Sequence, residues 1–219
     1  MDKHLVSASA GSAYYQENYA DYERQNSEEK MRFYDLLVDR WVKRNGKVLE
    51  FGCALGHYLG RIVDRYQCSA CDINEFGISK AREKFPNTPL WVGSYEVIPA
   101  DARFDGIVSW DVLEHLPNIE EGLTVLRSHL DQDGFLIAVV PIYDGFLGWL
   151  VRLLDHDPTH VTKVGRYQWI AMLEKSGFKV VEKGAILRKL VGKNYLHFTG
   201  PKKLLWYFGS AMYFVAKRG

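Results

Sequence analysis

The chain has 219 residues, with 28 Lys or Arg against 27 Asp or Glu, so its formal net charge is +1. This balance provides no electrostatic footprint for nucleic acid or for an anionic membrane surface, and no apolar run approaches the roughly 20 residues of a membrane-spanning helix. We therefore expect a cytoplasmic protein with no nucleic-acid or membrane partner, present as a monomer or a homodimer.

The N-terminal part of the chain, residues 1–44, predicts a helical cap. Ser27 followed by two glutamates is a typical helix start. The apolar residues that follow have the i, i+3, i+4, i+7 spacing of one helix face, at Tyr34, Leu37, Val38 and Trp41. Asn45-Gly46 then indicates a turn.

After this turn, short apolar runs alternate with helical segments. The predicted strands are Lys47–Phe51, Cys68–Asp72, Leu90–Val92, Phe104–Trp110, Gly134–Pro141, Phe178–Leu187 and Ala211–Lys217. The predicted helices are Gly56–Tyr66, Asn74–Phe85, Asn118–Leu130 and Gly165–Ser176, while residues 142–163 have no clear period. Such alternation favours an α/β domain, with a mostly parallel sheet and helices on both of its faces.

The cysteines are not expected to form a redox or metal pair. Cys68 and Cys71 are spaced as C-x-x-C, but they lie in one of the predicted strands. Side chains three positions apart in a strand point to opposite faces. We therefore expect two reduced core cysteines.

One turn has the composition of a ligand site. The run VLEFGCALG is a strand that ends in an acid, Glu50, followed by a glycine-rich turn and a helix. Glycine allows a ligand to approach the backbone closely, and ligands bind at the carboxyl ends of the strands in open α/β sheets. Asp72 ends the second predicted strand, where an acid can hold a ribose diol or, alternatively, cap the next helix.

With FDGIVSWDVLEHL around the fourth strand, the chain resembles the class I S-adenosylmethionine-dependent methyltransferases, especially their small-molecule branch. The later runs LDQDGFLIAVVP, SGFKVVEKG and SAMYFVAKRG look like the last strands of that family. The resemblance implies a Rossmann-like, seven-stranded, mostly parallel sheet with an antiparallel closing strand. It also implies a single domain over 1–219, in which 45–141 bind S-adenosyl-L-methionine and 142–219 face a small-molecule acceptor.

The resemblance also implies which residues bind the cofactor. The methionine end would lie on Glu50, Gly52, Cys53 and Gly56, and the ribose on Asp72. Ile73 would pack on the adenine, Trp110 and Val112 would close the other side, and Tyr19 of the cap would meet the cofactor carboxylate. Two positions depart from the family pattern. Ala54 replaces a glycine, and Ser94 stands where an aspartate often contacts the adenine, a contact that Ser94 or a nearby backbone carbonyl would then make.

The acceptor side is expected to carry the catalytic groups. His115 is a candidate general base, because its ordinary pKa is near 6.5 and its helix start faces the pocket. Alternatively, His115 only orders the loop after the fourth predicted strand. His156 and His160 lie in the segment where the family places acceptor contacts, and Tyr143, Arg152 and Arg188 are further candidates. No metal site is predicted, since Pro158 interrupts any helical pattern that would align His156 with His160.

Other function classes remain open at this point. One alternative is a regulatory protein that binds the cofactor without turnover. A nicotinamide-dependent oxidoreductase would expect G-x-G-x-x-G, whereas this turn reads GCALGH and would set Glu50 against a pyrophosphate. A nucleic-acid methyltransferase would expect a basic patch and an N/D-P-P-Y/F signature, and the chain has neither.

Overall fold

The computed structural model describes residues 26–146, 148–155, 159–191, 194–199 and 206–219. Two of the predicted site residues, Tyr19 and His156, lie outside these ranges. Within the described ranges, every helix is too short or too polar to cross a membrane.

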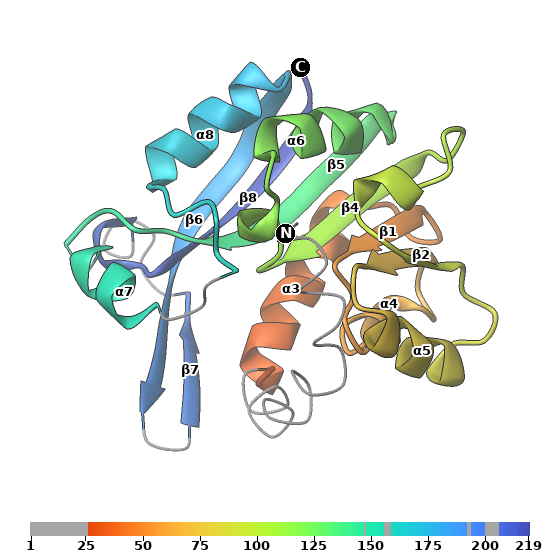
Figure 1. Cartoon of the computed structure of the whole chain (residues 1–219), viewed down its shortest axis with the longest axis horizontal. Coiled ribbons are helices and arrows are strands. Elements are labelled where there is room, and N and C mark those ends of the chain that lie inside the picture. The colour runs from red at the N-terminus through yellow and green to blue at the C-terminus, as the bar shows by residue number, and fades with distance from the viewer. Residues whose placement is uncertain (1–25, 147, 156–158, 192–193, 200–205) are drawn as a thin grey trace, which may run out of the picture.

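A mixed sheet of eight strands forms the centre of the fold, in the order β3-β2-β1-β4-β5-β8-β6-β7 (Figure 1). The first five strands pair in parallel, and β8 runs antiparallel between β5 and β6. The strands are β1 Lys47–Phe51, β2 Gln67–Asp72, β3 Leu90–Val92, β4 Phe104–Trp110, β5 Leu130–Pro141, β6 Phe178–Val191, β7 Asn194–Phe198 and β8 Ala211–Arg218. The predicted Rossmann-like sheet of seven strands with an antiparallel closing strand is therefore confirmed, and β7 is an addition at its edge.

Helices cover both faces of the sheet (Figure 1). One apolar layer joins the sheet to α3, α4 and α5, and the other joins it to α6 and α8. Alternation along β1 explains the two layers, because Val48 belongs to the first and Leu49 to the second. Cys68 and Cys71 also lie in different layers, and both side chains are buried in the core, as predicted.

The helices are α3 Glu28–Trp41, α4 Leu59–Ile62, α5 Glu75–Lys84, α6 Ile119–Ser128, α7 Gly148–Leu154 and α8 Arg166–Lys175, with short 3-10 turns η1 Tyr95–Val97 and η2 Leu113–His115. At the start of α6, Asn118 accepts from the backbone N–H of Glu121 at 3.3 Å and donates to its carboxylate at 2.9 Å. The helix ends at Ser128, so Leu130 begins β5 and does not continue the helix as predicted.

The helix predicted over Gly56–Tyr66 is wrong in its extent. Only Leu59–Ile62 is regular α-helix, and the residues on both sides form turns. Gly56 has a φ of +72°, which a right-handed helix excludes. The glycine-rich turn therefore includes the first residues of the predicted helix, which begins only at Leu59.

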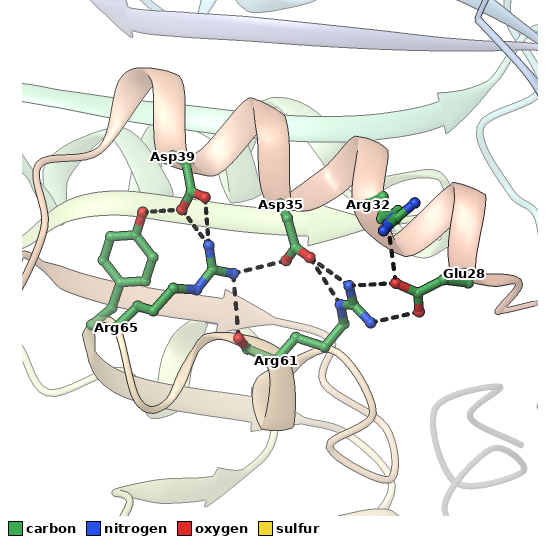
Figure 2. Close-up of polar contacts among 7 residues, drawn as sticks. Glu28, Arg32, Asp35, Asp39, Arg61 and Arg65 are labelled. Atoms are coloured by element: carbon green, nitrogen blue, oxygen red, sulfur yellow. Dashed lines mark hydrogen bonds and ion pairs between the residues drawn. The ribbon is translucent and has the colours of Figure 1, made fainter.

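A network of ion pairs holds α3 over this segment (Figure 2). Asp35 lies 2.6 Å from Arg61 and 2.8 Å from Arg65, while Glu28 reaches Arg61 at 2.9 Å and Asp39 pairs with Arg65. Arg61 and Arg65 are about one-quarter exposed, so such pairs contribute roughly 1 kcal/mol each at most. These pairs join α3 to α4 and to the turn that follows α4.

Candidate functional site

The turn after β1 lies at the carboxyl edge of the parallel strands and is bound to β2. The backbone N–H groups of Gly52 and Cys53 donate to the carbonyl of Cys71 at 2.8 and 3.1 Å. Gly52 has a φ of +86°, and a Cβ there would lie 2.3 Å from Cγ2 of Val112. The glycine-rich turn and the residues after β4 are therefore brought together as predicted. Ala54, with a φ of +47°, adopts the left-handed conformation that glycine takes more easily.

Glu50 is a buried carboxylate below this turn. Its exposed fraction is 3%, and its Oε2 has no hydrogen-bond partner within the described part of the chain. Burial, followed by the neighbouring charge of Asp72, raises the pKa of Glu50 well above its usual range, although the backbone N–H of Leu59 donates to it. A buried carboxylate of this kind favours a cationic ligand group and disfavours a phosphate.

Asp72, at the end of β2, holds the same turn. Its Oδ2 accepts from the N–H of Ala54 and its Oδ1 from the N–H of Asn74, both at 2.8 Å. The cap of α5 is Asn74 itself, whose side chain accepts from Gly77 at 2.9 Å. Asp72 is therefore not the cap, and each of its oxygens keeps a second lone pair with which to accept from a ligand hydroxyl.

Ile73 and Ser94 lie near Asp72 at the carboxyl ends of β2 and β3. Ile73 follows Asp72 and is 53% exposed. Gly93 donates its N–H to the carbonyl of Asp72 at 2.9 Å, which places Ser94 at the neighbouring strand end, where its own N–H donates to Glu96. The predicted adenine-side residues are thus neighbours.

Trp110, at the end of β4, is covered by two tyrosines. The Tyr34 ring stacks on it with centroids 4.0 Å apart and planes 6° apart, and Tyr58 meets it edge-on at 5.2 Å. The indole Nε1 is buried and has no hydrogen-bond partner within the described ranges. The sequence indicated Tyr34 only as a core residue of a helix face, so its place in this wall was missed.

A second group, of which the sequence indicated only Arg188, is centred on Asp111, which has a φ of +58°. Its carboxylate lies 2.5 Å from Arg188 and 3.7 Å from the amine of Lys30. Burial lowers the pKa of Lys30 to about 8, although Asp111 opposes the shift. Burial raises the pKa of Asp111, but Arg188 and Lys30 outweigh this and keep it below its usual range.

The predicted catalytic histidines His115 and His160 meet beside η2. Their ring centroids lie 4.7 Å apart, and Nε2 of His160 lies 4.0 Å from Oε1 of Glu114. Backbone pairing explains the approach, because the N–H groups of Val161 and Thr162 both donate to the carbonyl of Glu114, at 3.1 and 2.9 Å. The sequence could not show this pairing, which joins the end of β4 to the loop before α8.

Oxygen atoms fix the orientation of both imidazole rings. Nδ1 of His115 lies 3.1 Å from the carbonyl oxygen of Thr159, and Nδ1 of His160 lies 2.9 Å from Oδ2 of Asp155. Nδ1 of His115 also lies 2.9 Å from the Thr159 hydroxyl, which can donate or accept. Carbonyl and carboxylate oxygens only accept, so their contacts favour the tautomer with the proton on Nδ1 and the lone pair on Nε2.

Asp155 lies behind His160 and contacts two further polar side chains. Tyr143 donates its hydroxyl to Asp155, and the amine of Lys163 lies 2.9 Å away. Burial raises the pKa of Asp155, but the hydrogen bonds from Tyr143, His160 and Lys163 outweigh it and hold that pKa well below its usual range. Asp155 is therefore ionised at any physiological pH and can stabilise a positive imidazole.

The fold and the edge described above define a class: a Rossmann-like protein that binds its ligand across the carboxyl ends of β1, β2 and β4. A family model described as "Methyltransferase domain" matches residues 22–183. The chain therefore belongs to the class I S-adenosylmethionine-dependent methyltransferases, and its cofactor is S-adenosyl-L-methionine.

Solved structures share the fold at low sequence identity. An S-adenosylmethionine-dependent methyltransferase from Clostridium acetobutylicum has a TM-score of 0.69 at 13% identity, covering 94% of this chain and 98% of that one. A chain of the complex between the Haloferax volcanii Trm112 methyltransferase activator and a methyltransferase reaches 0.71 at 14%, covering 100% and 98%. A Thermotoga maritima protein described as a possible histamine N-methyltransferase reaches 0.65 at 16%, covering 94% and 98%. None of the curated proteins matches the chain.

Observations of the structure itself fit such a cofactor. The buried Glu50 oxygen, which has no hydrogen-bond partner within the described residues, suits the positively charged amino-acid end of the cofactor. The exposed face of Ile73 suits a flat apolar ring.

Proposed function

We propose that this protein transfers a methyl group from S-adenosyl-L-methionine to an oxygen or nitrogen nucleophile of a small molecule by in-line displacement. The observation that carries the proposal is the convergence of His115 and His160, with ring centroids 4.7 Å apart, at the same edge of the sheet as the glycine-rich turn. The balanced charge of +1 supports a small acceptor over a nucleic acid.

The binding residues would act as follows. Glu50 would hold the cationic amino-acid end of the cofactor, and Asp72 would accept from its ribose hydroxyls. Ile73 would pack on the adenine, with Ser94 beside it. Gly52, Cys53 and Gly56, with Val112 and Trp110, would shape the walls of the cradle. When bound, the cofactor supplies a methyl group that its sulfonium makes electrophilic.

The acceptor side has to orient the nucleophile and remove its proton. His115 and His160 both present an Nε2 lone pair that can accept this proton. Asp155, held ionised by its hydrogen bonds, would stabilise the imidazolium of His160. We expect His156, in the same segment, to contact the acceptor.

A transfer screen tests the proposal. The protein is incubated with methyl-labelled S-adenosylmethionine and fractionated metabolite extracts, and label is sought in small products. Transfer to a metabolite fraction supports the proposal, while label in added RNA or protein alone would contradict it. Tight cofactor binding with no labelled product in any fraction would favour a regulatory protein without turnover.

A further inference from the structure

Glu114, His115 and His160 bring three metal-ligand side chains together at the end of β4. Each offers one ligand atom, and these atoms lie within 4.8 Å of one another. The Glu114 carboxylate is 1% exposed and the His160 imidazole 18%, so the carboxylate is buried and the imidazole keeps some contact with solvent. We propose that these residues bind a divalent first-row transition-metal ion, with open positions for water or an acceptor oxygen.

The distances require only small movements. Zinc lies about 2.0–2.1 Å from nitrogen and carboxylate ligands, so neighbouring ligand atoms are roughly 3–3.5 Å apart. Oε1 of Glu114 and Nε2 of His160 are already 4.0 Å apart. Side-chain rotations that shift each atom by under about 1 Å close this gap around one ion.

The hydrogen bonds around the imidazoles have the arrangement that metal ligands need. Each ring is oriented through Nδ1, which contacts the Thr159 carbonyl in His115 and the Asp155 carboxylate in His160. Both contacts leave the lone pair on Nε2 and raise its basicity. Asp155 is in turn fixed by Tyr143 and Lys163, so the orientation of His160 does not depend on a ligand.

The donor set indicates which ions fit. Two imidazole nitrogens and one carboxylate oxygen suit Zn²⁺, Fe²⁺, Mn²⁺ or Co²⁺. Mg²⁺ and Ca²⁺ prefer oxygen ligands throughout. The sequence predicted no metal site because only His156 and His160 were considered as a pair of ligands. In the structure, the side chains next to His160 are instead Glu114 and His115, which follow β4.

Metal binding goes beyond the proposed function and does not depend on the acceptor. With an ion in place, the Nε2 lone pairs are ligands and do not accept the proton. The ion instead lowers the pKa of a bound water or hydroxyl group, as metals do in hydrolytic enzymes. Chelation therefore distinguishes histidines that act as general bases from histidines that act as metal ligands. Only if they are metal ligands should the protein lose activity with EDTA and regain it when the ion is added.

The direct test is a metal titration of the chelator-treated full-length protein, read by Co²⁺ absorption and by Zn²⁺ calorimetry. We expect one ion per chain. His115→Asn and His160→Asn keep a donor at the Nδ1 position but lack Nε2, so they should bind at least tenfold more weakly, as should Glu114→Gln. Asp155→Asn should weaken binding about 10–100-fold through the orientation of His160.

His129→Asn is the matched control. His129 is buried at the end of α6, with Nδ1 3.0 Å from the Ala102 carbonyl and outside the cluster, so its variant should bind the ion like the wild type. Thermal midpoints with and without Zn²⁺ check folding, and the ion should raise them only in the wild type and this control. The proposal would be overturned if His115→Asn and His160→Asn both bound the ion as tightly as the wild type. It would also be overturned if the wild type bound no ion at 0.1 mM, a concentration that corresponds to a binding free energy of about −5.5 kcal/mol. If Glu114→Gln unfolds, the two Asn variants decide.

Discussion

The side chain of Val112 fills the space that a Cβ on Gly52 would need, since that Cβ would lie 2.3 Å from Cγ2 of Val112. Gly52 also has a φ of +86°, in the left-handed region that side chains disfavour. This contact joins the turn after β1 to the residues after β4.

Gly52→Ala should therefore destabilise the protein by about 2–4 kcal/mol, from backbone strain and overpacking together. The double variant with Val112→Ala removes the collision and keeps the strain, so about half of the loss should return. Urea unfolding of the two single variants and the double variant measures this coupling. Additive effects would show that Val112 does not set the limit at Gly52.

Glu50→Gln should make the ligand-free protein more stable at pH 8 and weaken cofactor binding at least tenfold. The pKa of Glu50 is raised in the folded protein, so the native state binds a proton that the unfolded chain has released. The stability from this carboxyl is present below its ordinary pKa of 4.5 and is lost as the pH rises through the folded value.

The advantage of Glu50→Gln over the wild type should consequently grow from pH 5 to pH 8. Urea unfolding across this range measures it, and Glu83→Gln on the exposed face of α5 is the control. A difference that stays constant with pH would show that Glu50 is not the buried acid described above.

Asp72→Ala should weaken cofactor affinity by about 1.5–3 kcal/mol, the range for hydrogen bonds to a charged group. It should also lower stability, because Asp72 accepts from Ala54 and Asn74. Asn74→Ala removes the cap of α5 without touching the ribose position, so it should lower stability alone. Calorimetry on both variants distinguishes the roles, and equal affinities would assign Asp72 to the turn only.

Much of the fold could be predicted from the sequence because its signals are local. Strands β3 and β4 begin and end where the apolar runs predict, and Asn118 caps α6 through its own neighbours. By contrast β7 was missed, since its residues show no alternation of polar and apolar side chains. Its pairing depends on the extension of β6 to Val191.

The site divides in the same way. The positions of Gly52 and Asp72 follow from strand ends, which converge in any parallel sheet. The contacts of Trp110 with Tyr34 and of His115 with His160 join segments far apart in the chain. Residue types and spacings hold no information on such approaches, so Glu114, Tyr143 and Asp155 emerge as a cluster only in three dimensions.

His115→Asn and His160→Asn should lower methyl transfer at least tenfold while leaving cofactor affinity within about threefold, roughly 0.6 kcal/mol. Under the proposed function both side chains contact the acceptor, and neither contacts the cofactor. Turnover, calorimetry and thermal midpoint are measured on the same samples, with His129→Asn as control. A drop in thermal midpoint with full turnover per folded molecule would reduce both histidines to packing residues.

Calorimetry of the wild-type protein with S-adenosylmethionine, S-adenosylhomocysteine and NAD tests the central claim most directly. We predict one site per chain for the first two, with a Kd below about 100 μM (about −5.5 kcal/mol). NAD should bind at least a hundredfold more weakly, because its pyrophosphate would meet the buried Glu50. Tighter binding of NAD, or no binding of either methionine-derived ligand by the folded protein, would contradict the account.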